Sequence, residues 1–227
     1  MSSTELARFL DVALDVQAPP YPGIHVDFGL MVASNGVMLV TKRFDDKVFL
    51  RGKGAISPKA AKVLVALVEA TYIGSIEVND NRVTVTAQST WYDEKAGAEV
   101  AGGYREVTLP ELYCRQIPIK RMVEVLDDKA LGWEVLPLSS NPKLKTLKEA
   151  NAKDYVALVD SLHGGYELFR LRNIDDAHWY SVAQLRCGLR LFGKHSSLIV
   201  RRSKDGWLAF SDQWGYTFAI TPFVKRN

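Results

Sequence analysis

The spacing of apolar residues predicts helices at the start of the chain and after its first strands. Residues 3–16 begin with the capping pattern Ser2-x-x-Glu5 and then place apolar side chains every three or four positions. Residues 58–70 have the same spacing and begin with Pro58, at a position where a missing N–H is tolerated. We therefore expect two amphipathic helices in the first half of the chain.

The second half has two further segments with helical spacing. Residues 118–131 place apolar side chains on one face and end near a glycine. A fourth helix is predicted to begin behind Asp175 or Asp176. The side chains expected to face inward on this fourth helix are Val182, Leu185, Leu189 and Phe192.

Alternating or continuous short apolar runs between these helices predict strands. In the first half they cover residues 24–28, 30–33, 37–42, 48–51, 75–78, 82–88 and 106–109. In the second half they cover residues 133–138, 155–160, 166–172, 197–202, 207–211 and 216–220. The turns 34–36, 79–81, 162–165 and 204–206 separate neighbouring strands. Residues 93–104 are rich in glycine, alanine and charge, and are expected to form an exposed loop.

The two halves repeat one order of elements. In each half a helix is followed by three strands, and the last strand ends in Leu109-Pro110 or Thr221-Pro222. A period of about 110 residues is far longer than a solenoid repeat, so it indicates two domains of one fold. The predicted fold is α+β, with two tandem domains at 1–112 and 117–227, each with two helices on an antiparallel sheet.

Composition narrows the class of protein. The chain is 47% hydrophobic and 24% charged, which is typical of a globular protein with a packed core. No apolar run reaches the roughly 18 to 20 residues that span a bilayer, and the first residues do not resemble a signal peptide, so a cytoplasmic protein without a membrane partner is expected. Cys114 and Cys187 lie far apart without a Cys/His cluster, which argues against a disulfide framework and against a metal site.

Charge is distributed unevenly along the chain. Residues 1–110 carry 11 Lys and Arg against 13 Asp and Glu, whereas residues 111–227 carry 18 against 13. This asymmetry favours contact of the second half with a polyanion, although a solvated surface gives the same pattern.

With two copies of a helix-and-sheet unit, the chain resembles the DNA sliding clamps, the processivity factors of replicative polymerases. The ending Ile220-Thr-Pro-Phe-Val224 is similar to the apolar, proline-containing C-terminus of clamps. Two domains rather than three resemble the trimeric clamps of phages, archaea and eukaryotes, and the size is closest to the phage type. The pI of about 8.8 is higher than is usual for such clamps.

The resemblance implies a closed ring that surrounds duplex DNA without reading its sequence. Basic side chains on the helices would then face the DNA phosphates. The candidates are Lys59, Lys62, Lys120, Arg121, Lys129, Arg186 and Arg190. The first helix has only Arg8, beside Asp11 and Asp15. For each cation, an ordinary solvated helix face is the alternative.

The resemblance also implies that polymerase and other replication proteins dock through short peptides, and that a separate loader opens the ring. The docking groove would lie near the domain connector and the C-terminus, at Leu112, Tyr113, Ile117, Pro222, Phe223 and Val224. Packing of the connector against both domains is the alternative. No cofactor is implied.

The motifs of an enzyme are missing from the sequence. Adjacent acidic residues such as Asp45 and Asp46 point in different directions, and Gly52-Lys53-Gly54 is too short to hold a phosphate. Cys187 with His178 or His195 is the remaining catalytic candidate, and a buried thiol is the simpler interpretation. The alternatives to a clamp are thus a DNA-binding accessory protein that forms no ring and, ranked below it, a cysteine-dependent enzyme.

Overall fold

Two compact units make up the chain in the computed structural model. The first unit comprises Met1–Asn35 and Lys42–Ile119, and the second comprises Gly36–Thr41 and Lys120–Asn227. The residues that the structure describes are 3–19, 22–45, 49–93, 95, 97–109, 119–136, 156–159, 168–171, 175–192 and 198–223. The predicted domain boundary, between residues 112 and 117, lies outside them.

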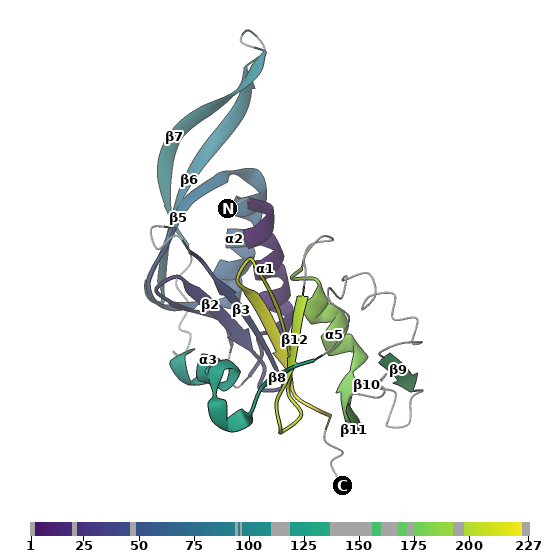
Figure 1. Cartoon of the computed structure of the whole chain (residues 1–227). Coiled ribbons are helices and arrows are strands. Elements are labelled where there is room, and N and C mark those ends of the chain that lie inside the picture. Colours follow the sequence, from purple (N-terminus) through teal and green to yellow (C-terminus); the bar gives the residue numbers. More distant parts are fainter. Residues whose placement is uncertain are drawn as a thin grey trace. The chain divides into compact units, whose positions relative to one another are not determined.

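The first unit is a sheet with two helices that pack against each other. Its helices are α1 (Ser3–Val16) and α2 (Pro58–Ala70), and its strands are β1 (Ile24–Asp27), β2 (Leu30–Ser34), β4 (Leu50–Ile56), β5 (Tyr72–Asp80), β6 (Arg82–Asp93) and β7 (Ala98–Thr108). The strand order is β7-β6-β5-β4-β1-β2 (Figure 1). Neighbouring strands are antiparallel except β4 and β5, which are parallel.

Both predicted helices of this unit are confirmed. The apolar face of α1 is fully buried, including Leu6, Phe9 and Leu10. At the start of α2, the hydroxyl of Ser57 accepts a hydrogen bond from the N–H of Ala60 at 3.2 Å, directly before the proline at the first helical position. Local capping and an apolar stripe thus explain both helices.

Two glycines allow β4 to lie against β5. A Cβ on Gly52 would stand 2.1 Å from the carbonyl oxygen of Val78, and one on Gly54 would stand 1.9 Å from that of Asp80. No side chain fits at either distance. The segment Gly52-Lys53-Gly54 therefore serves the parallel pairing of these two strands.

The described part of the second unit contains helices and strands of two sheets. It comprises α3 (Ile119–Asp127), the 3-10 helix η1 (Lys129–Leu131), α5 (Val182–Leu189) and the strands β3 (Met38–Arg43), β8 (Glu134–Val135), β9 (Val156–Val159), β10 (Leu168–Leu171), β11 (Asp175–Ser181), β12 (Leu198–Arg202), β13 (Leu208–Asp212) and β14 (Tyr216–Ile220). One sheet has the order β3-β14-β13-β12-β8, and the other has the order β11-β10-β9. The elements α2-β5-β6-β7 and α5-β12-β13-β14 confirm the predicted order of a helix followed by three strands.

Packing of α5 requires a glycine. A Cβ on Gly188 would stand 2.4 Å from a ring atom of Phe218, so only glycine lets the helix approach β14 this closely. The Phe218 ring also stacks on Phe210, with ring centroids 4.5 Å apart, and contacts Phe192. These aromatic contacts fix α5 on its sheet. All four residues predicted to face inward are buried, although Phe192 lies beyond the end of α5.

Three predicted elements are wrong in extent or type. Within residues 93–104, expected to be a loop, Asp93 ends β6 and residues 98–104 belong to β7. The fourth helix begins at Val182 with Ser181 as its cap, because Asp175–Ser181 is strand β11, paired with β10. The third predicted helix, residues 118–131, consists of α3 and η1, with the carboxylate of Asp128 capping η1 at the N–H of Ala130.

Candidate nucleic-acid interface

Helix α5 presents two arginines to solvent. Arg186 and Arg190 are both exposed and lie four residues apart, on one side of the helix. The opposite side is held by Gly188 against Phe218, and the N-terminus is capped by the Ser181 hydroxyl, which accepts from the N–H of Gln184 at 3.4 Å. Arg186 and the C-cap residue Arg190 therefore lie on the exposed side of α5.

The sequence around α5 contains no acidic residue from position 177 to position 204. Six Lys and Arg residues fall in that stretch. Several of them have contacts within the described part of the chain: Arg190 lies 3.6 Å from the sulfur of Cys187, Arg201 donates to the carbonyl of Leu126 and lies over the Trp133 ring, and Arg202 forms an ion pair with Glu134. The exposed positive charge of α5 itself is thus not balanced by carboxylates on the same helix.

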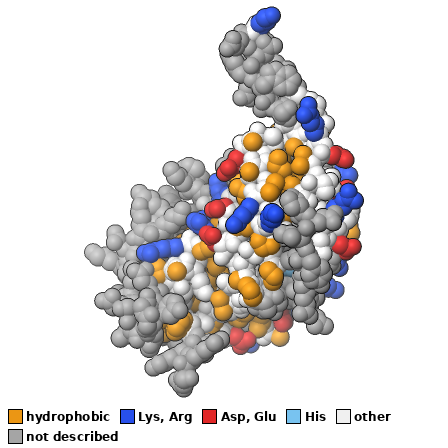
Figure 2. Space-filling view, turned by 180° about the vertical axis from the view of Figure 1, so that it is seen from behind, with side chains coloured by type: hydrophobic (Ala, Val, Ile, Leu, Met, Phe, Trp, Pro, Cys, Tyr) orange, Lys and Arg blue, Asp and Glu red, His pale blue; other side chains and the backbone are white. Residues whose placement is uncertain are grey.

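Helix α2 also exposes its predicted cations, but in a mixed environment. Lys59 and Lys62 are exposed, and so is Glu69 on the same helix. Helix α1, which packs against α2, exposes Asp11 and Asp15. On the face shown in Figure 2, Lys and Arg side chains likewise alternate with Asp and Glu instead of forming one continuous patch. The helices of the first unit are therefore less suited to phosphate than α5.

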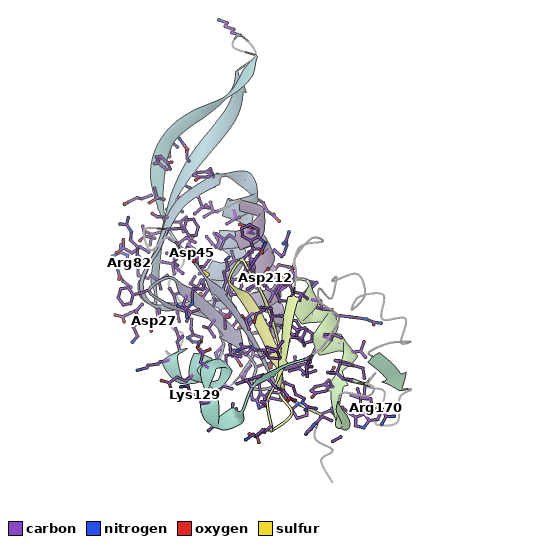
Figure 3. The ribbon with its side chains drawn as sticks, in the orientation of Figure 1. Asp27, Asp45, Arg82, Lys129, Arg170 and Asp212 are labelled. Atoms are coloured by element: carbon purple, nitrogen blue, oxygen red, sulfur yellow. The ribbon has the colours of Figure 1, made fainter. Side chains whose placement is uncertain are left out.

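The third predicted group is partly neutralised. On α3, Lys120 is exposed and lies 4.0 Å from the carboxylate of Glu124. Lys129 is exposed on η1, the turn after α3 (Figure 3), next to the exposed Asp127 and Asp128. The side chain of Arg121 lies outside the described residues.

The predicted peptide-docking residues are described only in part. Leu112, Tyr113, Ile117 and Val224 lie outside the described residues. Pro222 and Phe223 are half-buried, and the N–H of Phe223 donates to the carbonyl of Trp179 at 2.6 Å. The backbone at the end of the chain is thus tied to β11.

Sequence reasoning missed a strand edge and several exposed aromatic side chains. Strand β7 is the outermost described strand of the first unit. Its sequence contains Gly102-Gly103 and lacks apolar alternation, so the pattern does not predict its full length. The exposed aromatic side chains are Phe28, Tyr72, Tyr104 and Trp214. Their sequence context of turns and short strands gives no signal of exposure.

The catalytic candidate Cys187 is half-buried on α5, and its sulfur lies 3.6 Å from a guanidinium nitrogen of Arg190. His178 packs against Gly206, and His195 and Cys114 lie outside the described residues. Across the described part of the chain, no group of three or more His, Cys, Asp or Glu side chains is arranged to hold a metal ion. Among the described helices, none is both long and apolar enough to cross a membrane.

Comparison with known proteins gives a structural likeness only. No family model and no curated protein sequence matches the chain. The solved structure of DNA polymerase III subunit beta from Borrelia burgdorferi is similar over 100% of this chain and 64% of its own, with a TM-score of 0.59 and 13% identity. A sliding clamp, DNA polymerase III subunit beta, from Bartonella birtlesii is similar over 99% of this chain and 65% of its own, with a TM-score of 0.53 and 12% identity.

A third similar structure matches in length as well. PCNA from Thermococcus kodakaraensis is covered over 98% of both chains, with a TM-score of 0.51 and 14% identity. The chain therefore spans just under two thirds of the bacterial subunits and nearly the whole of the archaeal protein. At these identities the likeness establishes architecture, and the chain has the α+β sliding-clamp fold that its repeated order of elements predicts.

Proposed function

We propose that this chain is a DNA sliding clamp, a ring-shaped processivity factor that tethers a replicative DNA polymerase to duplex DNA. The observation that carries this proposal is the fold likeness over the whole chain, and above all the coverage of 98% of both this chain and an archaeal PCNA. Such a clamp acts by enclosing DNA, so the proposal includes no catalysis and no cofactor. It acts in the cytoplasm, which is that of the host if a phage encodes it.

A homotrimer is the proposed ring. Two units in one chain and a length equal to that of PCNA support three copies rather than two. A head-to-tail ring also needs two different edges on each copy. Among the described strands, β7 of the first unit and β8 of the second have a neighbour on one side only, so they supply open hydrogen-bonding edges for that purpose.

DNA binding is proposed to reside in exposed cations on helices. Arg186 and Arg190 lead this group, because α5 has no acidic residue, and Lys59 and Lys62 on α2 join them. Contacts of this kind neutralise phosphates independently of sequence and weaken as salt increases. That behaviour suits a protein that slides along DNA.

Polymerase and a clamp loader are the proposed protein partners. The docking region proposed for their peptides is the connector, residues 112–117, together with the tail at Pro222, Phe223 and Val224. The half-buried position of Pro222 and Phe223 leaves part of each side chain accessible to a peptide.

Two measurements test the ring. Light scattering across a concentration series should reach three times the 25.4 kDa of one chain. With DNA, the loaded protein should stay on a nicked circle and leave when the circle is cut, because an enclosed duplex releases its ring only at an end. A protein that remains monomeric at every concentration and is retained equally on circular and linear DNA would contradict the proposal.

One observation favours a second candidate, an accessory protein that binds DNA from one side. The stretch of six cations without an acid lies in a single segment, residues 177–204, rather than in both halves. Such a protein would bind linear and circular DNA alike. A cysteine-dependent enzyme would instead lose an activity when Cys187 is alkylated.

A further inference from the structure

Strands β6 and β7 continue beyond the sheet of the first unit as a ribbon. Within the sheet, β6 lies between β5 and β7, and the last pairs in this region are Tyr72 with Gln88 and Gln88 with Tyr104. Beyond Gln88, the pairs Thr90 with Ala101 to Asp93 with Ala98 join β6 and β7 alone. Figure 1 shows this ribbon leaving the sheet. We call residues 89–101 the arm.

An isolated ribbon of two strands is at best marginally stable in water. Ordering each backbone residue costs about 1 to 2 kcal/mol, and a two-stranded ribbon has no third strand or helix to bury apolar area against. The arm nevertheless contains Trp91, Tyr92 and Val100, which are strong strand formers. Among the described strands, only β6 and β7 pair in the arm, so its strand-forming sequence indicates that a second surface stabilises it.

The position of the arm identifies that surface. Strand β7 continues from the sheet, at Tyr104–Thr108, into the arm, at Ala98–Ala101, with an irregularity in its pairing with β6 between Gln88 and Thr90. It is the edge strand, and it contains no proline to block pairing. A strand that pairs with the edge of β7 in the sheet therefore ends next to the base of the arm.

Charge and exposed aromatic surface favour another copy of this chain as the occupant. The arm carries Asp93, Glu94 and Glu99 against the single Lys95. The second half of the chain has the opposite balance, with 18 Lys and Arg against 13 Asp and Glu. At the base of the arm, the exposed Tyr72 and Tyr104 offer aromatic area of the kind that interfaces favour.

We propose that the arm is a clasp that extends the contact between copies, reaching past the edge of β7 onto the second unit of a neighbouring copy. This inference rests on the proposed ring. It adds an acidic, aromatic contact outside the sheet-to-sheet pairing.

Shortening the arm is the first test. Replacing residues 89–103 by Asn-Gly joins Gln88 to Tyr104 through a two-residue hairpin turn and keeps their pairing. The shortened protein should keep its far-UV circular dichroism and its unfolding midpoint, because the rest of the sheet is unchanged. Its association constant, from sedimentation velocity at several concentrations, should fall about tenfold or more.

If the shortened protein does not fold, charge variants test whether the arm strengthens association between copies. The pair Asp93→Asn and Glu99→Gln removes two carboxylates from the arm and should weaken association in low salt. The matched control pair Glu69→Gln and Glu77→Gln removes two exposed carboxylates elsewhere in the first unit and should leave association unchanged. Equal effects of the two pairs would overturn the charge complementarity and, with it, the proposed occupant.

Hydrogen exchange can detect the proposed contact between the arm and a neighbouring copy in the unaltered protein. Amides of residues 98–101 should be protected more strongly in concentrated than in dilute protein. If the protein assembles but neither this protection nor association depends on the arm, the clasp is wrong and the ring stands. If the unaltered protein never assembles, the ring and the clasp both fall.

Discussion

His25 is a buried polar side chain in the first unit. It lies on β1 between Val32 and Ala55 of the neighbouring strands and is 1% exposed. Within the described part of the chain, neither ring nitrogen has a partner with good hydrogen-bond geometry. Burial lowers the pKa of His25 from 6.5 to about 4, and the nearby Pro22 backbone opposes this shift more weakly. The folded protein therefore holds this imidazole neutral in mildly acidic solution.

The protonation of His25 gives a prediction for stability against pH. Between pH 6.5 and about 4 the unfolded chain takes up a proton that the folded chain excludes, so the folded state loses free energy as pH falls through this window. Over the whole window the loss is on the order of 3 kcal/mol. His25→Leu removes this titration, so the variant should lose less stability than the natural chain when urea unfolding is compared at pH 7 and pH 4.

The same comparison contains its own control, because both proteins carry a neutral residue 25 above pH 7. There the difference in unfolding free energy between them should be constant. Parallel stability curves from pH 7 to pH 4 would mean that the imidazole is not excluded from protonation in the folded state.

At the scale of the element, α5 gives a sharper DNA-binding prediction than α3. Arg186→Gln with Arg190→Gln should lower affinity for duplex DNA, and should reduce the slope of log affinity against log salt by about 1 for each lost phosphate contact. Both side chains are exposed, so the unfolding midpoint should not change. Fluorescence anisotropy with a labelled duplex at several salt concentrations measures the slope.

A control for this pair lies on α3. Lys120 is also exposed, but the Glu124 carboxylate is 4.0 Å away, so Lys120→Gln should change the slope less. If the slope of log affinity against log salt falls equally for both variants, or for neither, α5 does not contribute more than α3 to DNA binding.

The elements that the sequence predicts well are those fixed by local signals. Helices α1 and α2 have their own caps and apolar stripes, and α2 begins at Pro58 as expected. Ala98–Tyr104 have no such pattern, and they belong to strand β7 because β7 pairs with β6, as in the pair of Gln88 with Tyr104. Asp175 and Asp176 mimic a helix cap, but pairing with β10 places them in a strand and moves the cap to Ser181. Pairing between distant residues is invisible to local propensity.

The candidate site is predictable to a similar degree. Helical spacing alone indicates that Lys59, Lys62, Arg186 and Arg190 avoid the apolar stripe, and all four are exposed. The acidic neighbours that distinguish α2 from α5 come partly from α1, which is far away in sequence, so only the fold brings them into consideration. The sequence thus indicates which cations are exposed, and packing determines which charges surround them.

At the scale of the whole molecule, the two units are not two consecutive pieces of chain. Residues Gly36–Thr41 belong to the second unit, although the residues on both sides of them belong to the first. They form most of β3, which lies beside β14, and the carbonyl of Val37 accepts a hydrogen bond from the N–H of Thr221 at 2.9 Å. The chain of the first unit is therefore continuous on both sides with a strand of the second unit, so unfolding of the first unit should disturb that strand.

Because residues 36–41 belong to the second unit but are flanked by the first, we expect the two units to unfold together. Of the five tryptophans, Trp91 alone lies in the first unit, so tryptophan fluorescence reports mainly on the second unit, while far-UV circular dichroism reports on both. The two signals should give one common midpoint in urea, since coupled units share a single transition. Val40→Ala, at a fully buried position of β3, should lower that midpoint for both signals by the same amount. Two separate midpoints, with only the fluorescence transition moved by Val40→Ala, would mean that the connection through β3 does not couple the units and that each is a domain in the thermodynamic sense.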